Sequence, residues 1–529
     1  MTKDESVVNV KGQDRDSKMK GSTMTSNGFD YIVVGGGTAG AVLAARLSED
    51  PDRAVLLLEA GPAYERDEYP EALLDPERIG GDEEHDWGFR ATAGEAGALS
   101  REIAAPRGKV LGGSSAVNAT VALRALPADF AGWTARGLPG WSWEEVLPTY
   151  RALEATEGGD DALHGRSGPL RIRQRPYDEL TPSVKAFIHA AEQRGYRYIV
   201  DPNADPGPGV AAVPVNVFAG ARQNTGIAYL TEDVRRRRNL SIRGHAEIDR
   251  VLFSGRAAVG VQAVDGTVYQ AGQVILSAGA IGSASILLRS GVGPARELHG
   301  LDIEVVADLP VGQQLQDQPV YHGVYALRPE AGDKFPAAGA FIRTASGQAE
   351  PGELDLLVSA AHLNAPGVSP TGGAIVLAVA VVRPESRGTL RLRSADPKDP
   401  PVIELNLLAT PRDRSRMLEG MKLSRAIGHG KVFGAVADSE LSPGEQIQGD
   451  EDLQRAIDEG VTSFQHATST APMGGGNDKR AVVDGAGAVR GVGNLRVIDA
   501  SILPAVPSVP PSLTVIMAAE HICRHSLAR

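Results

Sequence analysis

Three glycines and one acid near the N-terminus have the spacing of a nucleotide-binding site. Gly35, Gly37 and Gly40 form a GxGxxG pattern, and Glu59 follows 19 positions after the last of them. Glycine permits a sharp turn at the first position, a close approach to a pyrophosphate at the second, and tight helix packing at the third. A carboxylate at Glu59 can accept hydrogen bonds from both ribose hydroxyls and would repel a 2′-phosphate, which disfavours NADP.

The surrounding segments have the order that positions such a site. The apolar run 31–34 precedes the glycines, a small-residue helical pattern at 41–47 follows them, and a second apolar run at 55–58 leads to Glu59. The predicted helix offers free N–H groups and the positive end of its dipole to phosphates. The unit leaves open whether the dinucleotide is NAD or FAD, and its predicted binding residues are Gly35, Gly37, Thr38, Ala39, Gly40, Glu59 and Ala60.

The composition is that of a globular protein with a large core. The chain has 529 residues, 42% of them hydrophobic, so we expect two to four domains. A formal net charge of −12 gives no reason to expect nucleic acid or an anionic membrane as a partner. Cys523 is the only cysteine, which excludes an internal disulfide and a cysteine metal cluster. No metal site is predicted.

Neither end of the chain predicts a targeting or membrane segment. Residues 1–27 are polar and mixed in charge, which predicts a flexible tail without a secretory signal. The longest uncharged segment, 502–519, contains four prolines, which are incompatible with one membrane-spanning helix. We therefore expect a cytoplasmic protein with no membrane partner.

A second glycine-rich stretch lies at Pro106 to Arg124. Gly112 and Gly113 are followed by two hydroxyl residues, Ser114 and Ser115, and then by alternating apolar residues. Such a loop can lay backbone and hydroxyl groups against a polar ligand. The apolar residues behind it make a plain glycine-serine linker the weaker interpretation.

Three separated stretches together resemble the glucose-methanol-choline (GMC) oxidoreductases. They are the GxGxxG unit, PRGKVLGGSS from Pro106, and GAIGSASILLRSGVG from Gly279, where Ala284 replaces the usual proline. The resemblance extends from about Phe29 to the C-terminus and implies FAD as the cofactor. The fold it implies is α/β, with a discontinuous Rossmann-like FAD-binding domain and a second, substrate-binding domain.

We predict that the FAD-binding domain comprises residues 28–140, 222–320 and 470–529, and the substrate-binding domain residues 141–221 and 321–469. Apolar or alternating segments at 354–361 and 374–382 indicate an antiparallel sheet in the second domain. Helical periodicity at 142–157 and 182–194 indicates helices that flank it. The irregular stretch 428–449 indicates a mobile loop.

The resemblance also places residues around the cofactor. The Ile248 backbone would lie by the adenine, and Asp499 by the ribityl and pyrophosphate groups. Some members attach the flavin covalently through a histidine at the position of Val117, which cannot form that bond, so we predict noncovalent FAD. The further predicted cofactor-binding residues are Arg107, Gly112, Gly113, Ser114, Asn118, Ala119, Ile248, Ala278, Asp499, Ala500 and Thr514.

His466 is the predicted catalytic residue. Residues 464–474, FQHATSTAPMG, resemble the family pattern HxxGTxxMG, with Ser469 in place of the usual glycine. When hydride passes from an alcohol carbon to flavin N5, the hydroxyl proton must also leave, and histidine suits that exchange near neutral pH. The other ten histidines lack such a context and are predicted to be structural or surface residues.

Two positions depart from the family pattern. Ser512 stands where the family places a second histidine or asparagine beside the flavin, and serine cannot serve as a near-neutral base. Ser512 could also begin the last helix as its N-cap. The loop 309–319 resembles a family loop that usually has histidine where Gln318 stands.

The sequence thus predicts an FAD-dependent oxidoreductase that oxidises the CH–OH group of a small organic or natural-product substrate. His466 would accept the proton, Ser512 would at most position the oxygen, and dioxygen or another acceptor would take the electrons. A flavin-containing lyase, or another non-redox enzyme with His466 as acid/base, is the alternative. An FAD-binding protein without catalysis is the third and weakest interpretation, because it leaves His466 without a role.

Overall fold

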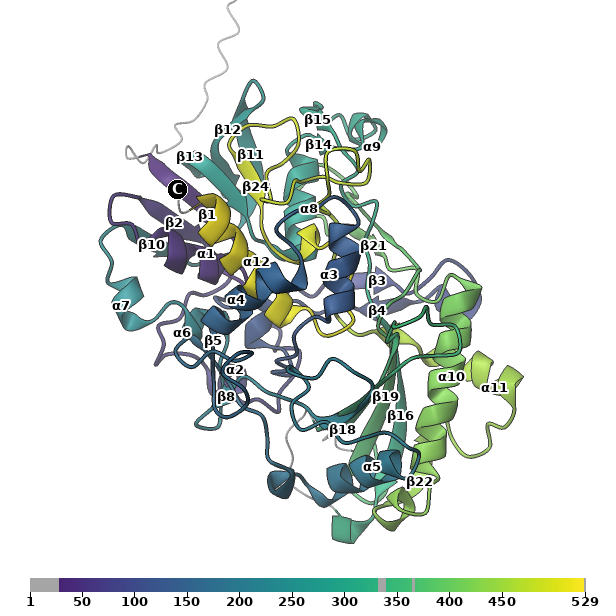
Figure 1. Ribbon diagram of the computed structural model, residues 1–529. Coiled ribbons are helices and arrows are strands. Elements are labelled where there is room, and N and C mark those ends of the chain that lie inside the picture. The colour runs from purple at the N-terminus through teal and green to yellow at the C-terminus, as the bar shows by residue number, and fades with distance from the viewer. Residues whose placement is uncertain (1–27, 332–338, 364–366, 528–529) are drawn as a thin grey trace, which may run out of the picture.

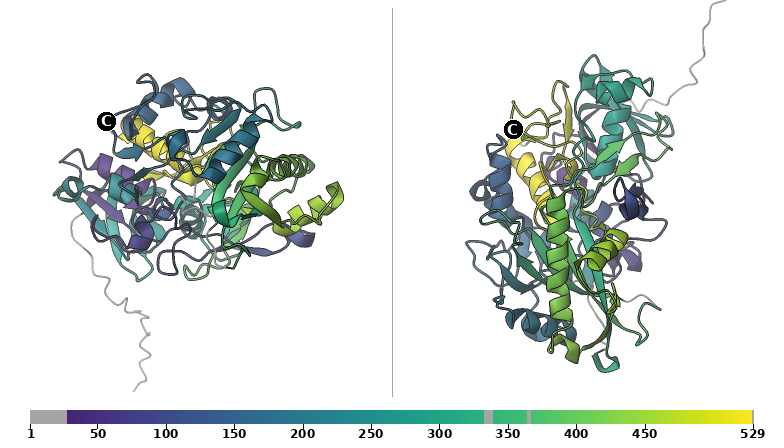
Figure 2. Two further views of the ribbon diagram at one scale, coloured as in Figure 1. Left: turned by 90° about the horizontal axis from the view of Figure 1, so that it is seen from below. Right: turned by 90° about the vertical axis from the view of Figure 1, so that its right-hand side faces the viewer.

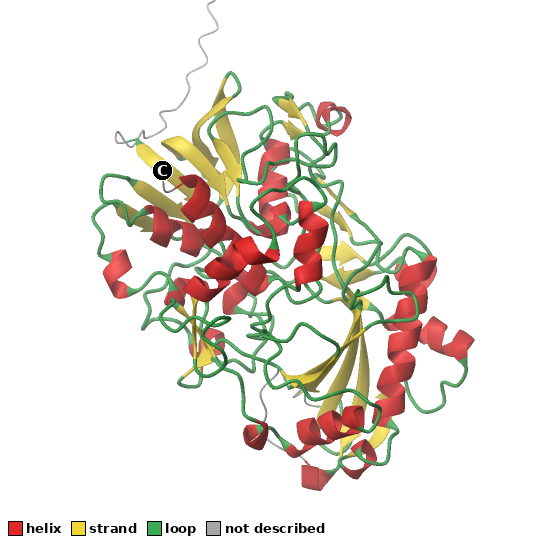
Figure 3. Cartoon of the chain, viewed as in Figure 1, coloured by secondary structure: helices red, strands yellow, loops and turns green. Residues whose placement is uncertain are grey.

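Two large sheets organise the chain, one in each half of the molecule (Figures 1 and 3). The structure is a computed structural model that describes residues 28–331, 339–363 and 367–527. The tail predicted at 1–27 lies outside these ranges. None of the helices within them combines the length and apolar character needed to span a lipid bilayer.

The first sheet is mainly parallel. Its strand order is β10-β2-β1-β13-β12-β11, and β24 also pairs with β13. The strands β10, β2, β1, β13 and β24 run parallel, whereas β11 and β12 extend the sheet as an antiparallel pair. The bounds are β1 (Phe29–Val34), β2 (Val55–Leu58), β10 (Leu240–Arg243), β11 (Ile248–Ser254), β12 (Ala257–Ala263), β13 (Val268–Leu276) and β24 (Leu495–Val497).

Helices bury the faces of this parallel sheet, as its apolar strands require. Helix α1 (Gly40–Leu47) connects β1 to the parallel strand β2, and α8 (Gly279–Arg289) follows β13. The C-terminal helix α12 (Ser512–Ile522) packs beside α1, where Arg46 forms an ion pair with Glu520, so the last described residues lie against α1 (Figure 1). The two ends of the described chain therefore close the same domain.

The second sheet is antiparallel. Its order is β22-β16-β19-β18-β17-β7, and β23 pairs with the start of β16. The bounds are β7 (Gly209–Ala212), β16 (Pro319–Leu327), β17 (Ala340–Thr344), β18 (Leu356–Leu363), β19 (Ala374–Val381), β22 (Ala437–Ser442) and β23 (Thr462–Ser463).

Helices α5 (Pro182–Glu192) and α10 (Pro411–Gly428) cover one face of the second sheet, and α11 (Asp450–Gly460) lies beside α10 (Figure 2). The alternate residues of β19, such as Ala378 and Ala380, belong instead to the core of the first half. All eight residues of β19 are therefore buried. This arrangement confirms the predicted fold class, an α/β protein with a Rossmann-like unit and an antiparallel sheet flanked by helices.

The prediction that residues 428–449 form an irregular loop is wrong. The segment contains strand β22, which pairs with β16. Its buried Glu440 accepts hydrogen bonds from Arg425 and Tyr325. A buried carboxylate with partners elsewhere in the chain hides the strand pattern. The helix predicted at 142–157 is α4 (Trp143–Leu153), which ends where β5 (Glu154–Thr156) begins.

Candidate cofactor and active site

The glycine turn between β1 and α1 is closely packed. Gly35 has a φ of +93°, and a Cβ added there would lie 2.6 Å from the Ser277 carbonyl oxygen. A Cβ at Gly40 would lie 1.8 Å from the Gly35 carbonyl oxygen, whereas one at Gly37 would make an ordinary 3.5 Å contact with Gly113 Cα. Gly35 and Gly40 are thus required for the turn itself, whereas a methyl group at Gly37 would make only ordinary contact with Gly113.

Glu59 joins the end of β2 to this turn. Its Oε2 accepts a hydrogen bond from the Gly36 N–H at 2.8 Å, and its Oε1 accepts one from the Gly61 N–H at 2.9 Å. Burial raises the pKa of Glu59 to about 7, although these backbone N–H groups act in the opposite direction. Each carboxylate oxygen keeps capacity for a further hydrogen bond.

The start of α1 has the donors that an anion needs. Within the described ranges, no protein acceptor is found for the backbone N–H groups of Gly37, Thr38, Ala39 and Gly40. The first helical bond runs from the Ala41 N–H to the Gly37 carbonyl at 3.1 Å. Unsatisfied N–H groups at a helix N-terminus bind phosphate groups. These residues therefore fit the pyrophosphate of a dinucleotide.

The GGSS loop lies against the glycine turn. The Gly112 N–H donates to the Gly36 carbonyl at 2.8 Å, and a Cβ at Gly113 would lie 2.7 Å from Gly37 Cα. Ser114 Oγ accepts a hydrogen bond from the Gly108 N–H, and Ser115 Oγ lies 3.2 Å from Thr225 Oγ1. Farther along, Asn118 Oδ1 accepts from the Thr120 N–H, with Ala119 between them.

Asp499 forms a third side of the same region. Its carboxylate accepts hydrogen bonds from the Gly279 N–H, the Ser283 hydroxyl and the Ser501 N–H, and burial raises its pKa. Ala278 precedes α8, and the Ala500 carbonyl accepts a bond from the Ser469 N–H. The turn, Glu59, Ala278 and Asp499 thus follow the carboxyl ends of β1, β2, β13 and β24, where α/β sheets bind ligands.

Two further predicted cofactor residues lie in β11 and in α12. Ile248 opens β11, two residues after Ala246, whose N–H donates to the Glu59 carbonyl at 2.8 Å. Thr514 lies in α12, with its hydroxyl 3.2 Å from the Tyr150 hydroxyl. Ala60 lies between Glu59 and Gly61, whose N–H binds the Glu59 carboxylate.

His466 is held at both its backbone and its ring. Its N–H donates to Asp317 Oδ1 at 3.0 Å, and its Nδ1 lies 2.6 Å from Gln318 Oε1. The ring packs on Phe464, with centroids 4.6 Å apart. Burial, together with the positive charge of Arg107, lowers the pKa of His466 to about 3, so the ring is uncharged near neutral pH.

Arg107 connects the His466 loop to the GGSS loop. Its Nη1 donates to Gln465 Oε1 at 2.8 Å, and its Nη2 lies 4.0 Å from Asp317 Oδ2. Burial lowers the pKa of Arg107, opposed by Asp317. The fold thus brings a predicted cofactor residue and the predicted catalytic residue to one place.

Ser512 is not bonded to His466 in the described part of the chain. It borders a small cavity together with Ser115, Gln223 and Thr225. The predicted N-cap role is wrong, because Pro511 already has helical dihedral angles and occupies the cap, which leaves Ser512 as the first residue of α12.

Asp317 and Thr225 were missed by sequence reasoning. Besides binding the His466 backbone, Asp317 accepts a bond from the Ser463 hydroxyl at 2.7 Å, so it shapes the loop that carries the histidine. Thr225 donates to the Gly37 carbonyl at 3.3 Å. An acid inside the loop that resembles a family motif was the available indication for Asp317; Thr225 had none.

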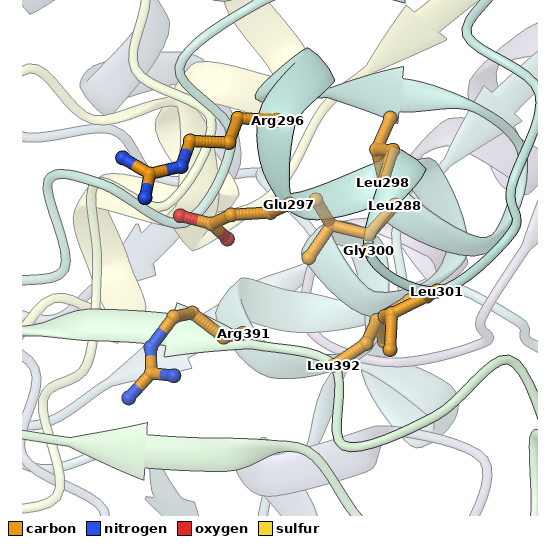
Figure 4. Close-up of a pocket in the computed structure, with 8 residues that line it drawn as sticks. All are labelled: Leu288, Arg296, Glu297, Leu298, Gly300, Leu301, Arg391 and Leu392. Carbon is orange, nitrogen blue, oxygen red and sulfur yellow. The ribbon is translucent and has the colours of Figure 1, made fainter.

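A separate surface hollow contains none of the predicted site residues. It is lined by α8, by α9 (Ala295–His299) and by the end of β20 (Thr389–Arg391), with Arg296, Glu297 and Arg391 pointing to one side and leucines to the other (Figure 4). Glu297 accepts a hydrogen bond from Gln313, and Arg391 pairs with Glu404. The hollow is not part of the site built around His466.

A parallel sheet with an anion-binding glycine turn, joined to an antiparallel sheet beside a neutral histidine, defines the class of dinucleotide-dependent oxidoreductases. The N-terminal and C-terminal models of the family "GMC oxidoreductase" match residues 29–320 and 384–519, respectively. The chain belongs to the GMC oxidoreductase family. It is an FAD-dependent alcohol oxidoreductase, as predicted.

The relatives cover nearly the whole chain. The chain is 36% identical to mitochondrial choline dehydrogenase of Mus musculus, over 93% of this chain and 88% of that protein. It is 37% identical to 5-(hydroxymethyl)furfural oxidase of Methylovorus sp. (strain MP688), over 94% and 98%. Among solved structures, pyridoxine 4-oxidase from Mesorbium loti is 31% identical with a TM-score of 0.86, over 95% and 99% of the two chains.

Proposed function

We propose that the protein oxidises a small primary alcohol, with His466 as the proton acceptor. Bound FAD would supply the hydride acceptor at its N5 atom. The observation that carries the proposal is the uncharged His466 ring, fixed by Asp317 and Gln318 where the two halves of the molecule meet. The names of the relatives, which refer to choline, 5-(hydroxymethyl)furfural and pyridoxine, support a small alcohol as substrate.

The residues divide the work as follows. The free N–H groups of residues 37–40 would bind the pyrophosphate, and Glu59 the ribose hydroxyls. Gly113, Ser114 and Asn118 would lie near the flavin. His466 would remove the hydroxyl proton, and Ser512, which cannot act as a base, would at most orient the substrate oxygen.

The replacement His466→Asn tests the proton acceptor. We expect the rate of anaerobic flavin bleaching by an alcohol to fall by about 100-fold or more, because general-base catalysis typically contributes that much. The rate is measured by stopped-flow absorbance across a panel of primary alcohols. The control is His299→Asn, since His299 is exposed at the end of α9. A fall of less than about threefold would remove His466 from the role of base.

The same experiment separates the enzyme classes. Bleaching by an alcohol supports oxidation, whereas turnover of a cyanohydrin-like substrate without bleaching would support the lyase alternative. Peroxide that forms under air would identify dioxygen as the electron acceptor. The relatives named above are all oxidoreductases, which gives the lyase no support.

We also propose that FAD is bound without a covalent link. Val117 packs among apolar residues that include Tyr69, Val110 and Ile227, and its side chain has no nucleophilic atom. We expect acid precipitation of the yellow protein to release all of its flavin into the supernatant, as measured by absorbance. Flavin that remained in the washed, denatured pellet would contradict the proposal.

A further inference from the structure

Gln318 is a fully buried glutamine with three hydrogen bonds from its side chain. Its Nε2 donates to the Val382 carbonyl at 2.9 Å and to the Pro507 carbonyl at 2.8 Å. Its Oε1 lies 2.6 Å from His466 Nδ1. The three partners come from the end of β19, the C-terminal segment and the His466 loop.

These partners allow only one orientation of the amide. Both backbone carbonyls can only accept hydrogen bonds, so the group that faces them must be the NH2 group. In the flipped orientation, Oε1 would lie against two carbonyl oxygens, and the buried polar atoms would lose their partners. The oxygen of Gln318 therefore faces His466.

The orientation of Gln318 fixes the proton on His466. An amide oxygen is an acceptor only, so His466 Nδ1 must carry a hydrogen to donate to it. A neutral imidazole with a hydrogen on Nδ1 has a lone pair on Nε2.

We propose that Gln318 is a positioning residue that selects the Nδ1–H tautomer of His466 and so leaves Nε2 as the atom that accepts the substrate proton. This inference rests on the proposed role of His466. Gln318 does so without charge, whereas the nearby carboxylate of Asp317 binds the backbone of His466 and not its ring. An uncharged acceptor fixes the tautomer without favouring the protonated ring as a carboxylate would.

The tautomer can be measured directly on the FAD-loaded protein. In protein labelled with 15N-histidine, long-range proton–nitrogen correlations distinguish a protonated ring nitrogen from one with a lone pair, and His466→Asn identifies the signals of His466. We expect Nδ1 to be protonated and Nε2 to be unprotonated. A protonated Nε2 in the unaltered protein would overturn the proposal, and this result needs no variant of Gln318.

Replacement of Gln318 tests whether the amide selects the tautomer. In Gln318→Met the ring loses its acceptor, so we expect a mixed or reversed tautomer and a fall in kcat of at least about tenfold, with a smaller change in KM. Gln318→His can donate to a carbonyl and accept from Nδ1, so we expect it to restore the tautomer and most of kcat. An unchanged tautomer in Gln318→Met would contradict the proposal.

Gln316 provides a matched control two residues away. It is also buried, its Nε2 donates to the Pro384 carbonyl at 2.7 Å, and its Oε1 accepts from the Val506 N–H at 3.0 Å. Its side chain therefore joins the same two segments as Gln318 without contacting His466. We expect Gln316→Met to lower the melting temperature while the His466 tautomer stays unchanged. If this control also changed the tautomer, the effect of replacing Gln318 would reflect a general loss of structure and not the choice of tautomer.

The two proposals can fail separately. If the tautomer follows Gln318 but no alcohol bleaches the flavin, the proposed function is wrong and the assignment of Gln318 stands. If alcohols bleach the flavin through His466 but the His466 tautomer does not change when Gln318 is replaced, the proposed function stands. The role assigned to Gln318 is then wrong.

Discussion

At the scale of the residue, the uncharged state of His466 determines the pH range in which it can accept a proton. A histidine in water has a pKa near 6.5, so a free one would be half protonated in mildly acidic solution. Burial and the positive charge of Arg107 lower the pKa of His466 to about 3. The neutral ring is therefore present throughout the pH range in which most enzymes are assayed.

We expect kcat/KM to show no acid limb from His466 between about pH 8 and pH 5, because the free enzyme would keep this ring neutral there. The profile is measured with an uncharged alcohol under saturating acceptor. Arg107→Met removes one cause of the low pKa and should move the acid limb to higher pH. An acid limb near pH 6.5 in the unaltered enzyme that disappears in His466→Asn would contradict the expectation.

At the scale of the element, the close approach of α1 to β1 depends on Gly40. We propose that cofactor binding depends on Gly37 instead. The sequence predicts a different role for each of the three glycines. In the structure, a Cβ at Gly40 would collide with the Gly35 carbonyl, whereas a Cβ at Gly37 would make only an ordinary contact. We therefore expect folding and cofactor binding to depend on different positions of one motif.

We expect Gly40→Ala to lower the free energy of unfolding by about 1–3 kcal/mol, because the backbone must move to admit the methyl group. Gly37→Ala should leave the apoprotein's melting temperature nearly unchanged and weaken FAD binding, since the methyl group would occupy the space above the turn. Melting curves and flavin titration of both apoproteins measure the two effects. Equal loss of stability in the two variants would refute the division.

At the scale of the whole molecule, a buried ionic cluster joins four separate segments of the chain. His164 lies between two carboxylates, with Nδ1 2.8 Å from Glu154 Oε1 and Nε2 2.7 Å from Asp201 Oδ2. Arg124 also binds Glu154 at 2.8 Å. Hydrogen bonds that the His164 ring donates to Asp201 and Glu154 raise its pKa to about 9.

This cluster predicts how stability changes in alkaline solution. The folded pKa of about 9 exceeds the unfolded value of about 6.5, so the contribution is fully present below pH 6.5 and is lost as the pH rises through 9. We expect His164→Leu to cost roughly 2–3 kcal/mol of unfolding free energy at pH 7 and much less at pH 10. Urea unfolding at both pH values measures this, with the exposed His189→Gln as control. A pH-independent cost would exclude the ionic explanation.

Two other histidines, His362 and His521, make the folded state less stable in acid. Burial is the main cause that lowers the pKa values of His362 and His521 to about 4. Below pH 6.5 the unfolded chain binds protons that these folded sites do not bind. These two histidines therefore lower the free energy of unfolding as the pH decreases.

Local motifs made part of the site predictable. The glycine turn, Glu59 and the GGSS loop each depend on a few neighbouring residues, and His466 lies in a recognisable sequence pattern. The partners of His466 were harder to predict, because Asp317 and Gln318 lie 149 and 148 residues away in the chain. Strand β22 was missed for the same reason, since its Glu440 is neutralised by contacts outside the strand.

The sequence by itself determined the α/β class, the family and the cofactor, because periodicity, glycine spacing and short motifs are properties of adjacent residues. Only the tertiary structure decided which nitrogen of His466 faces an acceptor, which glycine tolerates a side chain, and where Ser512 lies. Those properties depend on hydrogen bonds and steric contacts between segments that meet only when the chain folds, and burial then sets the protonation of the groups brought together.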